Sequence, residues 1–448
     1  MAEAAPAGDI ATLPAAVGAA LAQHAAIGAR IAIALSGGRD SVALFDAVVN
    51  LAATRNLAIT AIHIHHGLSP HADAWARFCA ELCAARTVPL IERRVDVARG
   101  ARKSLEAEAR RSRYAALSAA AISAGVRAIL LAHHQDDQAE TVLLQLLRGA
   151  GPHGLAAMPI ARTDATGIVW LRPLLDVPRA VIDAYIHARG LPFVDDDSNA
   201  DTRYARNALR ERVVPALASV VSGYPATVAR SARLTAEAAV LIDDLAAIDA
   251  ENACDGITLS RDALCALPPH RARNLLRWFL RRRGLPPPSA RRLDAMYAQL
   301  KDARVDARIC LSHAGLEIGI HRARIVVHRS APPPFEVRWN GETTLLLPHG
   351  SLEFAPVCGR GIAVTHLAAA EVIIRSRRGG ERIQLGADPP ARAVKSLLRE
   401  AGIPEWTRRG LPLVWCGDAL AAIPGIGVDS RFAAVESVAG IEPVWTEH

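Results

Sequence analysis

A glycine-containing segment near the N-terminus has residue types that suit phosphate binding. The segment Ser36–Ser41, with the sequence SGGRDS, directly follows an apolar run and precedes a run with helical periodicity. Glycines allow a tight turn that points backbone N–H groups outward, and the N-terminus of the next helix adds a positive dipole end. An ordinary glycine turn with Asp40 as helix cap is the competing interpretation. The number of specified positions in so short a segment favours a loop that binds phosphate or pyrophosphate.

The loop differs from two other common nucleotide-binding loops. It lacks the lysine of the GxxxxGK[ST] motif and the third glycine of the GxGxxG motif. We therefore expect neither a standard P-loop NTPase nor a dinucleotide-binding fold. The carboxylate of Asp40 can also position Mg²⁺ on a bound phosphate group.

Acidic residues at the start of another helix form the second candidate group. Asp136, Asp137 and Glu140 follow a short apolar run, and Asp136 and Glu140 are one helical turn apart. Carboxylates in this position can bind Mg²⁺ or can orient and deprotonate an incoming ammonium group. Favourable placement of acidic residues near a helix N-terminus is the alternative. Three acidic residues directly behind His133 and His134 exceed what that alternative requires.

The elements around both groups alternate between strands and helices. Short apolar runs of strand length occupy Ile31–Leu35, Ala58–His63, Leu90–Val95 and Ala128–Ala132. Helical patterns occupy Ser41–Thr54, Asp73–Ala85, Ser104–Ala124 and Asp136–Arg148. Such a βαβ series predicts a doubly wound, mostly parallel α/β sheet with helices on both faces. Ligands bind such sheets at the carboxyl ends of the strands, where both candidate groups lie.

The rest of the chain predicts further domains. A length of 448 residues corresponds to about three domains. Helical patterns predominate from Tyr204 to Arg283, and strand patterns follow at Ile309–His328 and Phe335–Leu347. We predict a catalytic domain over 1–224, a helix-rich middle domain over 225–337, a linker region over 338–370 and a small mixed α/β domain over 371–448.

Composition restricts the class of partner and the compartment. The net charge is +7 and most of the cations are arginine, which suits a polyanion such as RNA, although a coding bias toward arginine is the simpler explanation. Aromatic residues make up 4%, which disfavours a protein that binds single strands by base stacking. The seven cysteines show no CxxC pair, and no apolar run reaches the roughly 18 residues of a membrane helix. We expect a cytoplasmic protein without disulfides.

The hexapeptide at 36–41 resembles the SGGxDS motif of the PP-loop, or N-type, ATP pyrophosphatases. Within that superfamily the chain resembles the tRNA(Ile)-lysidine synthetase family. The resemblance covers most of the chain and is weakest from about Thr235 to Thr365. The matching segments are His63–Leu68, Glu108–Tyr114, His133–Thr141, Arg172–Leu175, Asp197–Asn199, Arg206–Asn207, Gly380–Arg382, Lys395–Leu398, Ile403–Pro404, Leu411–Leu413 and Ile423–Ile426.

The resemblance implies a fold, a reaction and partners. The fold is that of the adenine nucleotide alpha hydrolases, and the activity is a carbon–nitrogen ligase that uses ATP and Mg²⁺. The ligase joins free L-lysine to the wobble cytidine of the tRNA(Ile) with a CAU anticodon. The cytidine is first adenylated with release of pyrophosphate, and lysine then displaces AMP to give lysidine. The modified base pairs with A, which changes the decoding of the tRNA from methionine to isoleucine. A homodimer is an assembly that the sequence leaves open.

The resemblance also assigns roles to residues of this chain. Catalytic roles fall to Asp137, Arg113 and Asp40. Nucleotide-binding roles fall to Ser36, Gly37, Gly38, Arg39, Asp40, Ser41 and His63. Substrate or tRNA contacts fall to Arg110, Asp136, Glu140, Arg203, Arg206, Asn207, Lys395, Arg399 and Arg408. The expected ligands of Mg²⁺ are Asp40 and Asp136.

The basic residues in these assignments have simpler explanations as well. Arg110 and Arg113 share a helical face and can neutralise charge on the α-phosphate, but a solvated, salt-bridged face is the alternative and is preferred for Arg111. Arg206 and Arg210 recur at helical spacing and can contact tRNA phosphates. For Arg210 and Arg212, favourable capping of a helix after an acidic segment is an equal alternative.

Three other functions and one metal site remain as alternatives. A tRNA thiolase of the same superfamily also adenylates a base, but such enzymes usually need paired cysteines. A non-catalytic RNA-binding protein that senses nucleotide would release no AMP in response to lysine. An amidotransferase-type synthetase is disfavoured because no glutaminase cysteine constellation is visible. Zinc would need His63 and His65 together with Cys79 and Cys83, and is a minor alternative.

Overall fold

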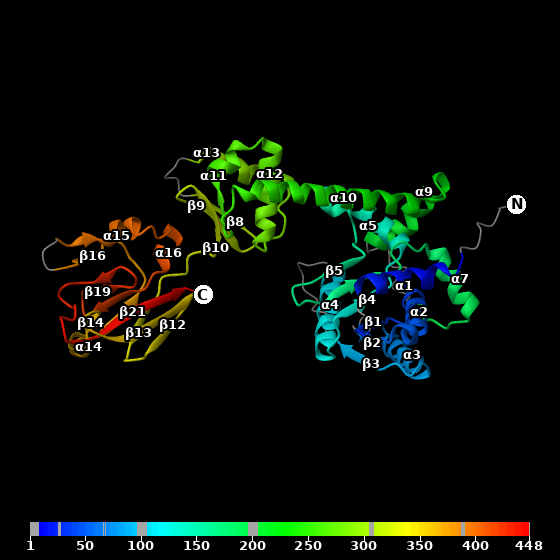
Figure 1. Cartoon of the computed structure of the whole chain (residues 1–448), viewed down its shortest axis with the longest axis horizontal. Coiled ribbons are helices and arrows are strands. Elements are labelled where there is room, and N and C mark those ends of the chain that lie inside the picture. The colour runs from blue at the N-terminus through cyan, green and yellow to red at the C-terminus, as the bar shows by residue number, and fades with distance from the viewer. Residues whose placement is uncertain are drawn as a thin grey trace. The chain divides into compact units, whose positions relative to one another are not determined.

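The computed structural model describes residues 9–25, 28–65, 67, 69–95, 105–195, 205–303, 309–386 and 390–447. The chain divides into two units, Met1–Ile242 and Asp243–His448. Figure 1 shows the helices and strands of both units. The predicted domain boundaries at 224, 337 and 370 stay predictions, and each unit is described by itself below.

Unit 1 is built on a six-stranded sheet with the order β3-β2-β1-β4-β6-β5. All neighbouring strands pair in parallel except β5 and β6, which are antiparallel. The strands are β1 (Arg30–Ala34), β2 (Ala58–His65), β3 (Leu90–Arg94), β4 (Ala128–Leu130), β5 (Ala161–Thr163) and β6 (Val169–Leu171). The predicted mostly parallel sheet is therefore confirmed. The expected strands agree with β1 to β4 within two residues at each end.

Helices cover both faces of this sheet, as the α/β prediction requires. They are α1 (Thr12–His24), α2 (Arg39–Arg55), α3 (Ala72–Ala85), α4 (Leu105–Ser123), α5 (Gln135–Leu147), α6 (Pro152–Leu155) and α7 (Arg179–Arg189). Successive residues of β1 point to opposite faces, so Ile31 and Ile33 pack with Phe45 of α2, while Ala32 packs with Leu117 of α4. Figure 1 shows α4 on one side of these strands and α2 on the other.

A run of short helices follows residue 204 in unit 1. It consists of α8 (Ala205–Ala208), the π-helical stretch η2 (Leu209–Val213) and α9 (Val214–Val220). The helix α10 (Tyr224–Glu251) then contains the boundary between the two units. The helical pattern was expected from the sequence, whereas the π-helical turn was not. Single π turns occur often at functional sites because they shift side chains out of the α-helical phase.

The first part of unit 2 combines three helices with an antiparallel sheet. The helices are α11 (Arg261–Ala266), α12 (Pro269–Arg282) and α13 (Ala290–Asp302). The sheet has the order β7-β10-β9-β8, with β7 (Thr258–Ser260), β8 (Cys310–His313), β9 (Leu316–His321) and β10 (Arg324–His328). Leu275, Leu276 and Phe279 from the apolar face of α12 are buried in the core that joins helices and sheet.

The remainder of unit 2 is richer in strands than expected. One sheet has the order β11-β15-β18-β19-β20, a second has the order β12-β13-β21-β14, and β16 pairs with β17. The strands are β11 (Glu336–Trp339), β12 (Thr344–Leu347), β13 (Gly350–Cys358), β14 (Ile362–Ala363), β15 (Val372–Arg375), β16 (Arg382–Ile383), β17 (Arg392–Ala393), β18 (Leu413–Cys416), β19 (Ala419–Ile423), β20 (Gly427–Val428) and β21 (Ala439–Glu447). The short helices are α14 (Val364–Ala369), α15 (Val394–Glu400) and α16 (Glu405–Gly410).

The range 338–370, expected as a linker region, contributes strands to this part. β13 pairs with β21 along its whole length, from Gly350 opposite Glu447 to Cys358 opposite Ala439. Leu352 and Phe354 of β13 are buried in the shared core. The partner strand lies about 90 positions later in the chain, and local sequence patterns do not reveal such a long-range pairing. The range therefore belongs to a sheet and does more than connect two domains.

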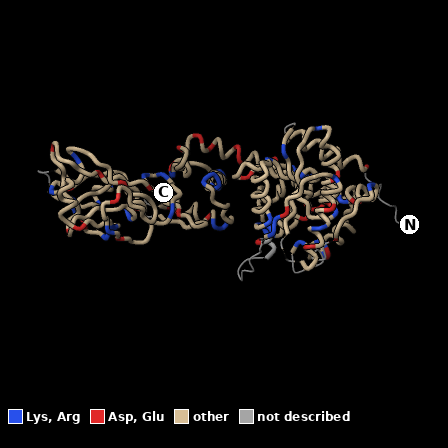
Figure 2. Tube along the Cα trace, turned by 90° about the horizontal axis from the view of Figure 1, so that it is seen from below, with Lys and Arg blue, Asp and Glu red and all other residues tan. Residues whose placement is uncertain are grey.

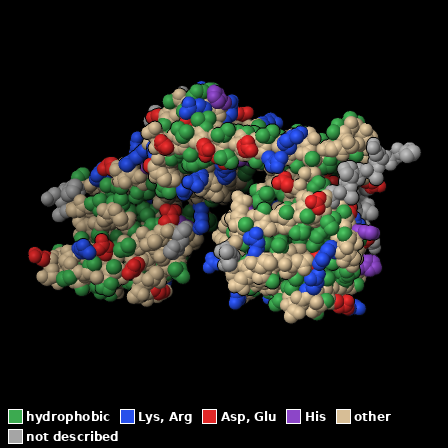
Figure 3. Space-filling view, turned by 45° about the vertical axis from the view of Figure 1, so that its right-hand side comes forward, with side chains coloured by type: hydrophobic (Ala, Val, Ile, Leu, Met, Phe, Trp, Pro, Cys, Tyr) green, Lys and Arg blue, Asp and Glu red, His purple; other side chains and the backbone are tan. Residues whose placement is uncertain are grey.

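Charged and apolar side chains are interspersed over both units. Figure 2 shows basic and acidic residues alternating along the traces of both, and Figure 3 shows hydrophobic side chains scattered among polar ones on the face in view. Across the described ranges, no helix combines the length and the apolar character needed to span a bilayer.

Candidate active site

The loop after β1 has the conformation that its glycines predict. Gly37 has φ of +87°, a left-handed conformation that other residues adopt with strain. A Cβ atom there would lie 3.0 Å from Cγ2 of Val194 and 3.3 Å from Sγ of Cys79, so space also requires glycine. The N–H of Val194 donates a hydrogen bond of 3.0 Å to the carbonyl oxygen of Gly37. Gly38 then caps the N-terminus of α2 in an extended conformation.

The two serines brace the loop from within. Oγ of Ser41 donates to the carbonyl oxygen of Gly38 at 2.8 Å and lies 3.3 Å from the N–H of Ser36, which donates to it. The N–H of Gly38 donates to Oγ of Ser36 at 3.4 Å. Among the described residues, the N–H groups of Gly37, Arg39 and Asp40 have no hydrogen-bond partner. These groups are available to an anionic ligand at the helix N-terminus.

The side chain of Arg39 is directed to a neighbouring helix. Its guanidinium forms an ion pair of 2.7 Å with Asp183 of α7 and lies 4.8 Å from the ring centroid of Phe193. The predicted role of Arg39 in nucleotide binding therefore rests on its backbone N–H in this structure. The side-chain contacts hold the start of α2 against α7.

Asp40 and the acidic residues of α5 meet around the imidazole of His134. Nε2 of His134 lies 3.8 Å from Oδ2 of Asp40 and 3.5 Å from Oδ2 of Asp137, while Nδ1 lies 3.7 Å from Oδ2 of Asp136. Burial lowers the pKa of His134, but the carboxylates of Asp136, Asp137 and Asp40 outweigh it, so the pKa is raised. The imidazole is therefore stabilised in its charged form among carboxylates.

The two expected magnesium ligands contact opposite nitrogens of this ring. Burial raises the pKa of Asp40, and the nearby carboxylate of Asp137 raises it further. Oδ1 of Asp40 is buried and has no hydrogen-bond partner in the described part of the chain. Asp136 instead accepts a hydrogen bond of 3.1 Å from the N–H of Arg179, and its pKa is lowered despite burial because His134 and Arg179 favour the charged form. Asp40 is thus the carboxylate with an unmet demand for a cation.

Asp137 and Glu140 are held by two arginines from the helices after residue 204. Nη2 of Arg206 and Nη2 of Arg210 each lie 3.0 Å from Oδ1 of Asp137. Nε of Arg206 lies 2.6 Å from Oε2 of Glu140, and Nε of Arg210 lies 2.5 Å from Oε1. Burial raises the pKa of Asp137, but His134, Arg206 and His133 outweigh it and the pKa is lowered. Asp137 is therefore ionised at neutral pH.

Further basic residues surround this group. Burial lowers the pKa of His133 to about 3, and the positive charges of Arg172, Arg110 and Arg206 contribute in the same direction. Arg172 is 4% exposed, and its Nε is one of the buried polar atoms without a hydrogen-bond partner among described residues. Arg110 of α4 donates to the hydroxyl oxygen of Tyr114 at 3.3 Å. The site is therefore lined by cations that can face an anion.

Arg113 also lies on α4, with its guanidinium 6.0 Å from the ring centroid of Tyr114. Sequence reasoning placed Arg110 and Arg113 near the site, and their charges do act on His133 and Arg206. It missed Arg172 as a site residue and left Arg210 undecided. The spacing of Arg206 and Arg210, which matches the spacing of Asp137 and Glu140 on a facing helix, is the signal that points to the pairing.

His63 and the nearby cysteines have local structural partners. Nδ1 of His63 donates a hydrogen bond of 2.9 Å to the carbonyl oxygen of Leu35, and burial lowers its pKa. Nε2 of His65 lies 3.1 Å from Asp73. Burial raises the pKa of Cys79 to about 12 and that of Cys83 to about 11. No cluster of metal-ligating side chains occurs in the described ranges, so the zinc alternative gains no support.

The remaining predicted tRNA contacts have varied surroundings. Lys395 and Arg399 are exposed on α15 of unit 2. Nε of Arg408 donates to the carbonyl oxygen of Ile403 at 2.5 Å. Asn207 lies in α8 beside Arg206, and Arg203 lies outside the described residues.

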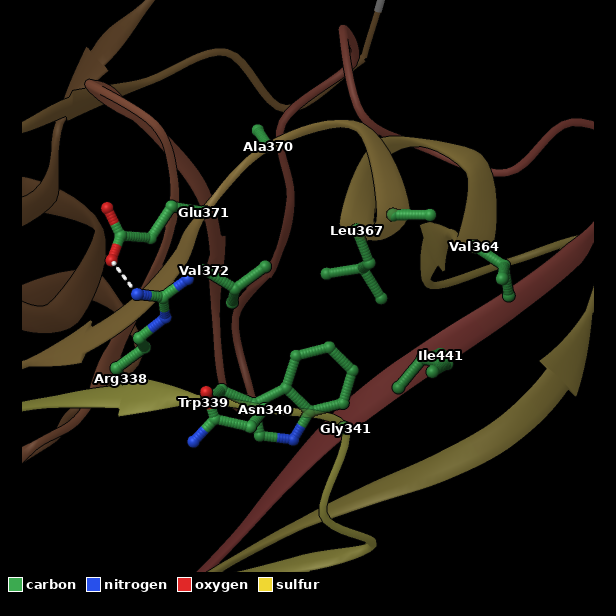
Figure 4. Close-up of a pocket in the computed structure, with 11 residues that line it drawn as sticks. Arg338, Trp339, Asn340, Gly341, Val364, Leu367, Ala370, Glu371, Val372 and Ile441 are labelled. Atoms are coloured by element: carbon green, nitrogen blue, oxygen red, sulfur yellow. Dashed lines mark ion pairs between the residues drawn. The ribbon is translucent and has the colours of Figure 1, made fainter.

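A cavity of about 410 Å³ in unit 2 contains none of the predicted residues. Figure 4 shows Trp339, Leu367 and Ile441 around it, with an ion pair of 3.2 Å between Arg338 and Glu371 at one side. Its walls are mostly apolar, and the nucleotide chemistry predicted for this chain is not assigned to it.

The class of the protein follows from the arrangement in unit 1. A parallel sheet with a glycine-rich loop after β1 and carboxylates after β4 defines a PP-loop enzyme, a class that uses ATP. A family profile described as a PP-loop domain matches residues 16–217. Profiles described as the TilS substrate binding domain and the TilS substrate C-terminal domain match residues 259–327 and 372–445.

Relatives with the same domains extend along nearly the whole chain. A tRNA(Ile)-lysidine synthase of Azoarcus sp. (strain BH72) is 42% identical over 94% of this chain and 93% of its own length. That of Nitrosomonas europaea is 40% identical over 93% and 92%. The chain belongs to the tRNA(Ile)-lysidine synthase family. Among solved structures, a U34-tRNA thiolase of Methanococcus maripaludis is 14% identical with a TM-score of 0.45, over 50% of this chain and 78% of that one.

Proposed function

We propose that this chain uses ATP to join L-lysine to the wobble cytidine of the CAU-anticodon tRNA(Ile). The C2 oxygen of the cytidine attacks the α-phosphate of ATP, and pyrophosphate leaves. The ε-amino nitrogen of lysine then attacks C2 of the adenylated base, the bond between C2 and the bridging oxygen breaks, and AMP leaves. Membership of the synthase family along nearly the whole chain supports this reaction.

The loop after β1 supplies the groups that would hold the pyrophosphate. The N–H groups of Gly37, Arg39 and Asp40 have no protein partner among the described residues, and they open the N-terminus of α2. Backbone donors of this kind bind phosphate oxygens without side-chain entropy cost. The internal bonds of Ser36 and Ser41 keep the loop in this conformation before ATP arrives.

Asp40 is the residue that would bind Mg²⁺. Its unpartnered Oδ1 and its raised pKa both indicate a carboxylate that lacks a cation. Mg²⁺ prefers one or two carboxylates together with phosphate oxygens, which fits this position beside the loop. When bound, the ion would neutralise charge on the triphosphate. Asp136 is a weaker candidate because the N–H of Arg179 already bonds to it.

Asp137 and Glu140 would receive the ε-ammonium group of lysine. Both are buried, and the lowered pKa keeps Asp137 ionised at neutral pH. An ionised carboxylate holds an ammonium group in place and accepts hydrogen bonds from it. Because only the neutral amine is nucleophilic, Asp137 would also accept the proton that the nitrogen loses as the carbon–nitrogen bond forms.

The arginines on the same side would stabilise the departing phosphates. Arg110 and Arg113 lie on α4, and Arg172 is buried with an unpartnered Nε. Positive charges fixed before the reaction stabilise negative charge that develops on the α-phosphate oxygens. Exposed Lys395 and Arg399 would contact tRNA phosphates from unit 2. Arg206 was predicted to do the same, but it bonds to Asp137 and Glu140 in this structure.

One observation carries the proposal: free amide groups of the SGGRDS loop and the buried carboxylates of α5 lie together at one edge of the parallel sheet. His134 links them, since its ring is within 4 Å of Asp40 and of Asp137. A site with phosphate donors alone would serve many ATPases. The added carboxylates fit a cationic second substrate.

The test is incubation of the purified chain with labelled L-lysine, ATP, Mg²⁺ and CAU-anticodon tRNA(Ile), followed by nucleoside analysis. We expect labelled lysidine and one AMP per lysine incorporated. The methionine tRNA with the same anticodon is the matched control and should remain unlabelled. AMP release that does not depend on lysine, or no labelled nucleoside with intact ATP, would contradict the proposal.

The thiolase alternative gains no support from the cysteines near the loop. A sulfur carrier must be a thiolate to react, and burial raises the pKa of Cys79 to about 12 and of Cys83 to about 11. Both thiols therefore stay protonated at neutral pH. A non-catalytic, nucleotide-sensing protein is distinguished by the incubation above, because it would form no lysidine.

A further inference from the structure

The two arginines on the carboxylates of α5 fill the place where the proposed substrate cation would bind. Oδ1 of Asp137 accepts from Nη2 of both Arg206 and Arg210, and its Oδ2 accepts from the N–H of His134 at 3.1 Å. Each oxygen of Glu140 accepts from the Nε of one arginine. All four carboxylate oxygens therefore have donors in the chain without lysine.

The charges of this group also balance without a ligand. Two carboxylates face two guanidinium groups, so the sum over the four side chains is zero. An added ammonium group would bring an excess positive charge into a site that His134, Arg172 and Arg110 already make cationic. Buried charges without a partner are strongly disfavoured. A lysine that binds here is therefore accommodated only if a positive charge leaves.

The exposure of the four side chains shows which of them can leave. The side chains of Asp137 and Glu140 are 11% and 5% exposed, whereas those of Arg206 and Arg210 are 21% and 31% exposed. The carboxylates are thus fixed on the inner side, and the arginines approach from the solvent side. Both arginines stand on the short segment formed by α8 and η2, and Arg210 lies in the π-helical turn.

We propose that Arg206 and Arg210 act as a built-in competitor of lysine: they neutralise Asp137 and Glu140 in the free enzyme, and the ε-ammonium group binds by displacing Arg210. This inference rests on the proposed function, because it takes lysine as the substrate. Arg210 is the group that leaves, since it is the more exposed and makes two of the printed contacts against three for Arg206. Arg210 is thus a positioning residue that sets lysine affinity.

The test uses Arg210→Gln in the full chain and measures lysine binding by isothermal titration and by thermal unfolding. Removal of the competitor should lower the dissociation constant of lysine about tenfold relative to the unaltered chain. The variant should unfold at a lower temperature than the unaltered chain, and millimolar lysine should restore much of the loss. A residue that only supports the fold would show the loss without the recovery.

A second buried carboxylate in unit 1 supplies the matched control. Asp46 is also paired with two arginines, one of which is Arg86, and no predicted site residue contacts it. Arg86→Gln should lower the unfolding temperature as well, but lysine should not restore it. Norleucine, which has the same chain without the ammonium group, should have no effect on either variant.

Several outcomes would overturn the inference. They are an unchanged or weaker lysine affinity in Arg210→Gln, equal lysine recovery in Arg86→Gln, or equal recovery with norleucine. If Arg210→Gln does not fold, Arg206→Gln takes its place in the same titration with the same expected direction. Lysidine formation by the unaltered chain is measured in parallel. Its presence together with a failed titration contradicts only the competitor, whereas its absence contradicts the proposed function.

Discussion

Two buried carboxylate clusters in unit 1 use the same residue types for different ends. Asp46 of α2 is 1% exposed and accepts hydrogen bonds from Tyr185 at 2.8 Å, Asn50 at 3.0 Å and Nε of Arg189 at 3.1 Å, and also pairs with Arg86. These partners belong to α2, α7 and the C-terminal end of α3. The cluster joins three helices that pack on one face of the sheet.

The second cluster, Asp137 and Glu140 with Arg206 and Arg210, lies at the carboxyl edge of the sheet. Near it are buried polar atoms that have no partner in the described part of the chain, on Asp40, His133 and Arg172. In folded proteins such atoms are rare and indicate a ligand, a water or stored strain. Arginine pairing of a buried carboxylate is therefore no guide to function by itself. The unmet hydrogen bonds around it separate a site from a support.

The largest expected effect comes from Asp137→Asn. Loss of the ionised acceptor should reduce lysidine formation by about 1,000-fold, because the amide can neither hold the ammonium group as a charge partner nor accept its proton. Binding of tRNA should stay within about twofold, since the phosphate contacts are elsewhere. Single-turnover nucleoside analysis and filter binding measure the two quantities. Full activity of the variant would remove the distinction between the clusters.

Asp46→Asn should affect stability and not chemistry. The change leaves Arg86 and Arg189 without their carboxylate, and because both arginines are partly exposed the free energy of unfolding should fall by about 2–3 kcal/mol. Urea unfolding gives this value. Lysidine formation per folded molecule should be unchanged, and a selective loss of turnover would place Asp46 in the active site.

Asp40→Asn should raise stability at neutral pH while it lowers ATP-dependent activity. The pKa of Asp40 is raised above 3.8 by burial, so the folded state holds this proton more tightly than the unfolded chain and loses stability as pH rises above 3.8. The asparagine variant escapes this loss, and its advantage should vanish below pH 3.8. Asp137 has the opposite sign, because its lowered pKa stabilises the fold above 3.8. Unfolding temperatures across pH 3 to 8 would show both trends.

Lys395→Ala should have the smallest effect, since an exposed cation acts through solvent. We expect a few-fold weaker tRNA binding and a salt slope smaller by about one, which is the signature of one lost phosphate contact. Lysidine formation at saturating tRNA should be unchanged. An unchanged slope would show that Lys395 touches no phosphate and has, like Asp46, no part in substrate binding.

Sequence patterns predicted the parallel sheet and the site loop because both depend on short-range features. The apolar runs of β1 and β4 and the glycines at 37 and 38 act locally, so their positions were correct within two residues. The carboxylates of α5 were placed at the strand ends for the same reason. The roles of the predicted residues stay predictions until the variants are tested.

Features that depend on distant partners could not be predicted. Nothing local in the apolar segment around Asp46 indicates that Tyr185 and Arg189 will reach it from α7. The pairing of β13 with β21 is similarly remote in sequence. Arg206 and Arg210 were expected to face tRNA, since an exposed basic helix is the ordinary reading of their spacing. Their binding to buried carboxylates is visible only when α5 and α8 come together.

The π-helical stretch Leu209–Val213 has a consequence for chain length. A π turn contains one residue more than the α turn that it replaces. Deletion of Val213 would restore α geometry while Arg206 and Arg210 keep their separation, and the following helix α9 would rotate by about 100° about its axis. The turn therefore sets the rotational phase between the arginines and all that follows them, and this segment should tolerate substitution far better than insertion or deletion.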